Sequence, residues 1–168
     1  GDVKKIMPKL KKKFDRILFA ILREHEEMFQ ASSVLKKIFT NAKVLVLDEL
    51  THGQAETVLK MLKHFKVSGP FYVKDSDSYF KPLTDYNKNK NYISVCNAKK
   101  VPHVKLYNKS FVDINDQNYV TRTSEKEIMS NFFSCGGYFF SKADDFIETF
   151  IRYKAMQIRG EFFISNII

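Results

Sequence analysis

Residues 51–57, Thr-His-Gly-Gln-Ala-Glu-Thr, lie between two short apolar segments, residues 44–47 and residues 71–74. The second apolar segment leads directly into Asp75 and, two residues later, Asp77. A strand, a polar turn containing glycine, a helix and a second strand ending in aspartates is the order in which an open parallel sheet forms a binding crevice at its strand ends. This order constrains the fold of the first half of the chain more than any other feature.

The first eighty residues are predicted to alternate between strands and helices. The continuous apolar run at residues 17–22 is typical of a strand that is covered on both faces. Residues 24–39 are predicted to form one or two short helices, and residues 54–65 a helix with an apolar face. This alternation favours an α/β fold with a mostly parallel, Rossmann-like central sheet flanked by helices.

The second half of the chain has a different pattern. Residues 81–91 are rich in Lys and Asn and predict a loop, whereas residues 92–119 consist of short alternating segments that predict an inserted antiparallel hairpin region. Residues 141–157 predict a final helix. Near the N-terminus, the spacing of apolar residues predicts a helix over residues 3–14, although Pro8 lies in the middle of it.

The length of 168 residues predicts a single domain that can bury a sound core. Cys96 and Cys135 are far apart and lack the spacing of metal ligands, so free thiols are expected. We divide the domain into a core part at residues 1–80, an inserted part at residues 81–140 and C-terminal helices at residues 141–168.

The chain carries a formal net charge of +9. Much of the excess is lysine interspersed with asparagine, as in residues 87–91, and the basic residues do not alternate with aromatic residues on one face. We therefore expect a polyanionic small molecule rather than nucleic acid as the partner. There is no apolar run long enough to span a bilayer and no signal peptide, so we expect no membrane association and a cytoplasmic location.

Asp75 and Asp77 are the first candidate site residues. Two carboxylates at the end of a buried strand can bind a hard divalent cation that is itself bound to a polyphosphate. In an extended backbone, residues two apart point to the same side. The alternative is that one aspartate caps the following turn and that neither binds metal.

Two other blocks contain candidate residues. Gly53 permits close approach of a ligand to the backbone, and the Gln54 amide can read a base edge. Glu125 and Lys126 can hydrogen bond with a hydroxyl group and bind a phosphate, while Gly137 leaves room for a substrate ring. Each block also has a simpler interpretation, namely an ordinary helix start for the first and a solvated Glu-Lys pair for the second.

In order and spacing, the three blocks together resemble the sugar-phosphate nucleotidylyltransferase superfamily, including bacterial enzymes of capsule and cell-surface precursor synthesis. Residues 53–57 are similar to its base-reading turn and helix, and residues 74–80 to the strand that ends in its metal-binding aspartate. Glu125-Lys126 followed by residues 136–138 are similar to its sugar-phosphate clamp and the glycine strand after it. The resemblance covers roughly residues 14–168.

The resemblance implies that a phosphate oxygen of a sugar phosphate, or of a similar phosphorylated acceptor, attacks the α-phosphorus of a nucleoside triphosphate. Pyrophosphate then leaves. The nucleotide is expected to be CTP or UTP, and the cofactor Mg²⁺. The implied catalytic residues are Asp77 and Lys126, the metal ligands Asp77 and Asp75, the nucleotide contacts Gly53, Gln54 and Thr57, and the acceptor contacts Glu125, Lys126 and Gly137.

The sequence departs from the family pattern in two places. No Gly-rich loop with a catalytic Lys precedes Ile17, and no second metal-binding Asp is found before Ile168. Three explanations stay open: the sequence is part of a longer natural chain, another copy supplies the strand by swapping, or the protein is a truncated, inactive relative. We expect the fold to be incomplete and the 168-residue chain alone to be inactive. Two alternatives remain open, a non-catalytic module that binds nucleotide or protein and a nucleotide-sugar glycosyltransferase.

Overall fold

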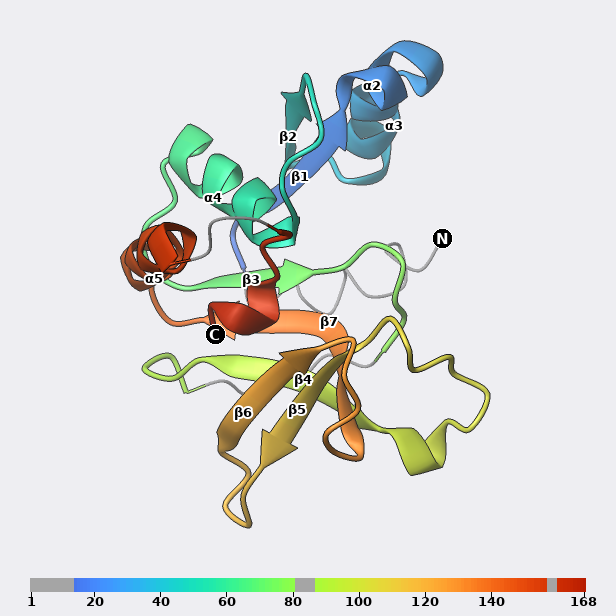
Figure 1. Ribbon diagram of the computed structural model, residues 1–168. Helices are drawn as coiled ribbons and strands as arrows, with labels where there is room; N and C mark the ends of the chain where they lie inside the picture. Colours follow the sequence, from blue (N-terminus) through green and yellow to red (C-terminus); the bar gives the residue numbers. More distant parts are fainter. Residues whose placement is uncertain (1–13, 81–86, 157–159) are drawn as a thin grey trace.

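The computed structural model describes residues 14–80, 87–156 and 160–168 (Figure 1). Its elements, in chain order, are β1 (Ile17–Leu22), α2 (Arg23–Phe29), α3 (Ala31–Ile38), β2 (Ala42–Leu47), α4 (Gln54–His64), β3 (Phe71–Lys74), β4 (Tyr92–Asn97), η1 (Ala98–Lys100), β5 (Ser110–Ile114), β6 (Val120–Glu125), β7 (Phe132–Phe140), α5 (Ala143–Met156) and η2 (Ile164–Asn166). The predicted strands at residues 17–22, 44–47 and 71–74 and the predicted helices at residues 24–39, 54–65 and 141–157 are confirmed, with shifts of a few residues at their ends. The helix predicted for residues 3–14 lies outside the described residues except for Phe14, and so does most of the loop predicted for residues 81–91.

The strands form two sheets rather than the single, mostly parallel sheet expected from the sequence. β1 and β2 are paired in parallel, from Ile17 opposite Ala42 to Leu22 opposite Leu47. Among the described strands, all other pairings are antiparallel, including that of β3 with β7. A strand–helix–strand pattern predicts the local elements, but it does not specify which strand edges meet. The partner of β3 comes from more than sixty residues further along the chain.

The larger sheet is organised around β7. Tyr138 of β7 has β3 on one side and β4 on the other, and Phe133 has β5 on one side and β4 on the other. Therefore β3 and β5 lie along the same edge of β7. β3 is paired with residues 137–140 of β7, whereas β5 is paired at Phe133. The antiparallel region predicted for residues 92–119 is confirmed as β4 and β5, with β6 completing the sheet.

The main core lies between this sheet and helices α4 and α5, which lie beside β3 and β7 (Figure 1). The Phe71 and Phe140 rings are stacked, with centroids 5.0 Å apart, and the Phe146 ring meets Phe140 edge-on at 4.9 Å. Burial of each such ring stabilises the fold by about 1.5–3 kcal/mol. This core fixes the start of α4 relative to the end of β3.

The predicted free thiols are confirmed for Cys96 and Cys135, which are both half-buried. Burial, followed by the neighbouring Cys96, raises the pKa of Cys135 to about 11. Cys135 is therefore protonated at neutral pH.

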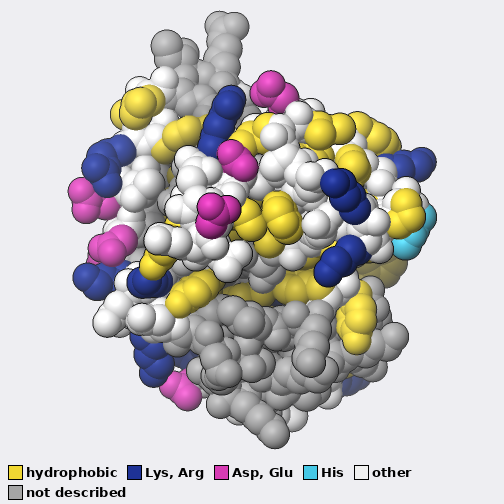
Figure 2. Space-filling model, turned by 90° about the horizontal axis from the view of Figure 1, so that it is seen from below, with side chains coloured by type: hydrophobic (Ala, Val, Ile, Leu, Met, Phe, Trp, Pro, Cys, Tyr) yellow, Lys and Arg dark blue, Asp and Glu magenta, His cyan; other side chains and the backbone are white. Residues whose placement is uncertain are grey.

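Positive charge is dispersed over the face shown in Figure 2. There the Lys and Arg side chains lie around the rim and among apolar side chains rather than in a single stripe. Within the described ranges, no helix combines the length and the apolar character needed to cross a membrane.

Candidate functional site

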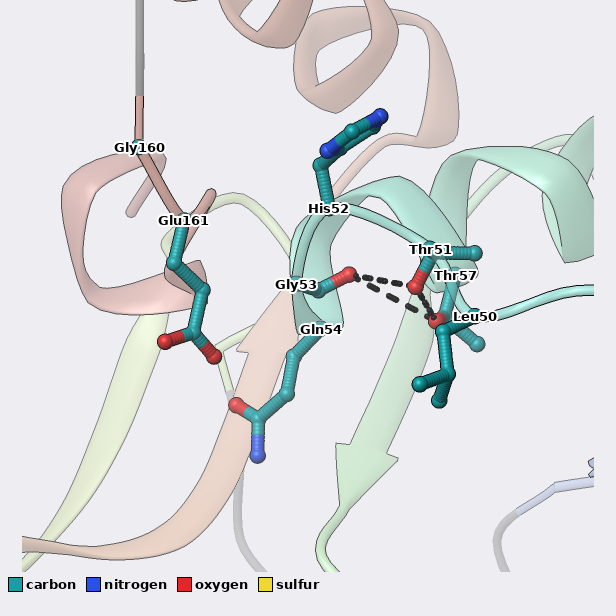
Figure 3. A pocket seen from close by; sticks show the side chains of 8 residues that line it. All are labelled: Leu50, Thr51, His52, Gly53, Gln54, Thr57, Gly160 and Glu161. Carbon is teal, nitrogen blue, oxygen red and sulfur yellow. Dashed lines mark hydrogen bonds between the residues drawn. The ribbon is translucent and has the colours of Figure 1, made fainter.

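The turn before α4 is held together by its own side chains. The Thr51 hydroxyl donates to the Gly53 carbonyl at 3.0 Å and lies 2.7 Å from the Thr57 hydroxyl (Figure 3). The His52 backbone N–H donates to the Glu56 carboxylate at 2.6 Å, so a side chain from the first turn of α4 also holds this segment. Since the Thr57 hydroxyl is already engaged within the turn, its predicted contact with nucleotide stays a prediction.

Residues 160–168, which we call the C-terminal segment, hold this turn from the other side. The Phe162 N–H donates to the His52 carbonyl at 2.6 Å, and the Ala55 N–H donates to the Phe162 carbonyl at 3.0 Å. Gly53 has a φ of +118°, and a Cβ built on it would lie 2.6 Å from the Phe162 carbonyl oxygen. In this structure it is therefore the chain itself that closely approaches Gly53, and contact of Gly53 with a base remains a prediction.

The second part of the site is the turn at the end of β3. The Asp75 N–H donates to the Gly136 carbonyl at 2.8 Å, which extends the pairing of β3 with β7 by one residue. The Lys74 ammonium group donates to the carbonyls of Asp75 and Ser78 and lies 4.7 Å from the centre of the Phe80 ring. Lys74 therefore closes the turn that holds Asp77 at its exposed rim.

Asp75 is half-buried, and its environment opposes ionisation. Burial, followed by the negative charge of Asp77, raises the pKa of Asp75 from 3.8 to about 6, while the neighbouring Gln54 amide acts in the opposite direction. Gln54, Asp75 and Asp77 line one cavity of about 840 Å³. The structure thus brings together the amide and the two carboxylates that the sequence singled out in separate blocks.

A divalent cation fits these two carboxylates. Two neighbouring carboxylates repel each other, and a bound cation reduces this repulsion. In the described part of the chain, no group of three or more His, Cys, Asp or Glu residues is placed to hold a metal. Mg²⁺ typically binds one or two carboxylates and takes its remaining ligands from water and substrate phosphates. Asp75 and Asp77 therefore suit a cation that arrives with a nucleotide.

The third part of the site is the end of β6. The Ser110 hydroxyl donates to one Glu125 carboxylate oxygen at 2.8 Å, and the Ser165 hydroxyl donates to the other. Lys126 has a φ of +60°, and its N–H donates to the Lys109 carbonyl at 3.0 Å. The backbone pairing of β6 thus continues as far as Lys126, whose left-handed conformation ends the regular strand.

Glu161 connects this third part to the turn before α4. Its carboxylate lies 3.9 Å from the Lys126 ammonium nitrogen, and it lines a cavity of about 590 Å³ with Gln54. Figure 3 shows the Glu161 and Gln54 side chains extending to the same side of the turn, whereas His52 extends to the other side. Our reading of the sequence missed Glu161, because an isolated acid between Gly160 and Phe162 has no motif of its own.

The two glycines of β7 differ in what surrounds them. Gly136 has a φ of +78°, and a Cβ there would overlap the Asp75 carboxylate, so glycine leaves the room that Asp75 occupies. Next to Gly137, the equivalent space is filled by Tyr72 and by Phe80, which would lie 2.5 Å from a Cβ. The predicted contact of Gly137 with an acceptor therefore stays a prediction.

Comparison with solved structures identifies the fold. The chain is similar to the nucleoside-diphosphate-sugar pyrophosphorylase from Vibrio cholerae RC9, with a TM-score of 0.75 and 21% identity over 96% of this chain and 71% of that chain. It is also similar to the inositol-1-phosphate CTP transferase from T. maritima, with a TM-score of 0.70, 14% identity and coverage of 98% and 66%. For HddC from Yersinia pseudotuberculosis, the TM-score is 0.61 and the identity 15%, with coverage of 97% and 68%. The chain has a nucleotidyltransferase-like fold.

The predicted resemblance to the sugar-phosphate nucleotidyltransferases is therefore confirmed at the level of the fold. The chain spans between 66% and 71% of the length of these three structures. No protein-family model and no curated protein sequence matches it.

Proposed function

We propose that this nucleotidyltransferase-like site transfers a nucleoside monophosphate from a nucleoside triphosphate to a sugar phosphate or a similar phosphorylated acceptor, with release of pyrophosphate. The observation that carries the proposal is the shared cavity of Gln54, Asp75 and Asp77. Gln54 also lines the smaller cavity with Glu161, whose carboxylate lies 3.9 Å from the Lys126 ammonium nitrogen. These contacts support a proposed metal–nucleotide side at Asp75 and Asp77 and a proposed acceptor side at Lys126. The inositol-1-phosphate CTP transferase and the nucleoside-diphosphate-sugar pyrophosphorylase are structural neighbours whose names fit this chemistry.

In the proposed reaction, an oxygen of the acceptor phosphate forms a bond to the α-phosphorus while the bond from that phosphorus to the leaving pyrophosphate breaks. Asp75 and Asp77 would hold Mg²⁺, which neutralises charge on the triphosphate when it is bound. Gln54 would orient the base, and Lys126 would bind the acceptor phosphate as a point charge. Glu125 and Glu161 would accept hydrogen bonds from acceptor hydroxyl groups. The protein contributes mainly position and charge.

Replacing Asp77 with Ala is expected to weaken binding of Mg²⁺–CTP and Mg²⁺–UTP by roughly 10- to 100-fold, because loss of one charged contact costs about 1.5–3 kcal/mol. Isothermal titration calorimetry with and without Mg²⁺ measures this. Asp116→Ala is the matched control, because Asp116 is an exposed acid in the β5–β6 hairpin turn. Equal affinities for wild type and Asp77→Ala, both dependent on Mg²⁺, would refute the assignment of Asp77.

The 168-residue chain by itself is expected to bind nucleotide without measurable turnover, which is the behaviour of a non-catalytic module. The supporting observation is that no described strand belongs to both sheets, while β1 of the smaller sheet and β3 of the larger sheet both line the large cavity. A pyrophosphate-release assay with CTP or UTP, Mg²⁺ and α-glucose 1-phosphate or inositol 1-phosphate tests this. Turnover that Asp77→Ala abolishes would show that the chain is a working enzyme, and sugar transfer from a nucleotide sugar would indicate a glycosyltransferase instead.

A further inference from the structure

Both carboxylate oxygens of Glu125 accept hydrogen bonds from hydroxyl groups that lie on distant segments. Ser110 at the start of β5 donates to one oxygen at 2.8 Å, and Ser165 in η2 donates to the other. A glutamate at the end of a strand normally has three rotatable bonds and keeps its carboxylate in water. Here the two hydroxyls select one position for the carboxylate, and each oxygen keeps a lone pair for a further donor.

Ser165 is well placed to hold that position. It is a polar residue that is only 3% exposed, and its neighbours Ile164 and Ile167 belong to the main core. Its backbone carbonyl accepts a hydrogen bond from the Thr123 hydroxyl at 3.0 Å. The Ser165 hydroxyl is therefore anchored both by packing and by the strand that carries Glu125.

The C-terminal segment that carries Ser165 also contacts Lys126 and the turn before α4. Glu161 is paired with Lys126, whose ammonium nitrogen lies 5.3 Å from the centre of the Phe163 ring. Phe162 exchanges two backbone hydrogen bonds with the turn. Residues 161–165 thus contact Glu125 and Lys126, which are on the proposed acceptor side. They also contact the turn before α4, which is on the proposed nucleotide side.

We propose that Ser165 is a positioning residue, which orients the Glu125 carboxylate toward the hydroxyl groups of the acceptor. The proposal rests on the proposed function, because it assigns the acceptor side to Glu125. If Ser165 has this role, the C-terminal segment sets the affinity for the acceptor through the Ser165 hydroxyl. This effect is independent of the backbone hydrogen bonds between the segment and the turn before α4.

Removing the Ser165 hydroxyl is expected to weaken acceptor binding about tenfold, since a hydrogen bond to a charged group contributes about 1.5–3 kcal/mol and 1.4 kcal/mol is tenfold in affinity. Titration calorimetry with α-glucose 1-phosphate and inositol 1-phosphate compares wild type, Ser165→Ala, Ser165→Thr and Ser110→Ala. Ser165→Thr keeps the hydroxyl and restores binding, and Ser110→Ala weakens it as Ser165→Ala does. Affinity for Mg²⁺–CTP or Mg²⁺–UTP stays unchanged.

Ser130→Ala is the matched control. Ser130 precedes β7, and its hydroxyl donates to the Val112 carbonyl at 2.6 Å rather than to Glu125. An equal loss of acceptor affinity in Ser130→Ala, or an equal loss of nucleotide and acceptor affinity in Ser165→Ala, would show that the hydroxyl is merely structural and would overturn the proposal.

A second measurement separates the failure of this inference from that of the proposed function. The ¹³C resonance of the Glu125 carboxyl carbon is expected to shift in Ser165→Ala but not in Ser130→Ala, whether or not an acceptor binds. An unchanged resonance overturns the positioning role. A shifted resonance in a protein that binds nucleotide but neither acceptor supports the role of Ser165 in orienting Glu125 and overturns the acceptor assignment.

Discussion

Gly53→Ala is expected to destabilise the protein by about 3–5 kcal/mol, among the largest effects of a single substitution. At a φ of +118°, an L-residue is strained, and its Cβ would lie 2.6 Å from the carbonyl oxygen and 2.7 Å from the nitrogen of Phe162. These are backbone atoms that are hydrogen bonded to the turn before α4, so they cannot move aside without breaking those bonds. The free energy of unfolding from urea titration measures the effect.

Gly69→Ala is the control for backbone strain alone. Gly69 has a φ of +77°, but no atom lies within 4 Å of a Cβ placed there. Gly69→Ala is expected to lower the free energy of unfolding by about 1–2 kcal/mol, which is the strain of a left-handed residue. If Gly53→Ala costs no more than Gly69→Ala, the contact between the C-terminal segment and the turn does not hold in solution. Loss of nucleotide binding in a stably folded Gly53→Ala would instead favour the predicted ligand contact.

Asp75→Asn is expected to remove a pH dependence of stability worth about 2–3 kcal/mol. The pKa of Asp75 is raised from 3.8 to about 6 in the folded protein. Between these values the folded state binds more protons than the unfolded state, so stability falls as pH rises through this window and is constant above it. The stability of the asparagine variant, which does not titrate, should therefore rise relative to that of wild type as pH rises from 4 to 7.

Urea titrations of both proteins between pH 4 and pH 7 provide the test, because the difference between them cancels the titration of other groups. Asp77→Asn is the companion variant. It removes the negative charge that raises the pKa of Asp75, and its difference from wild type should show the same sign with a smaller size. Mg²⁺ should stabilise wild type at pH 7 more than Asp75→Asn. If the free energies of unfolding of wild type and Asp75→Asn change with pH in parallel, the environment assigned to Asp75 is contradicted.

The sequence alone allowed much of the local structure to be predicted. The 3.6-residue spacing in residues 54–65 predicted α4, and the apolar runs at residues 17–22 and 71–74 predicted β1 and β3. Glu125 and Lys126 could be selected as a pair because they are adjacent in the chain. In contrast, Glu161 and Ser165 reach Glu125 and Lys126 from about forty residues away, and no spacing rule indicates that contact.

The sequence determined the order of the elements and the presence of polar groups at their ends, since periodicity and turn residues act over a few positions. Only the tertiary structure decided that β3 pairs with β7 in antiparallel fashion, that Gln54 and Asp75 line the same cavity, and that the backbone of Phe162 occupies the space beside Gly53. The reason is physical. Strand pairing and close packing join residues far apart in the chain, and their energies depend on the whole set of surfaces that become buried together.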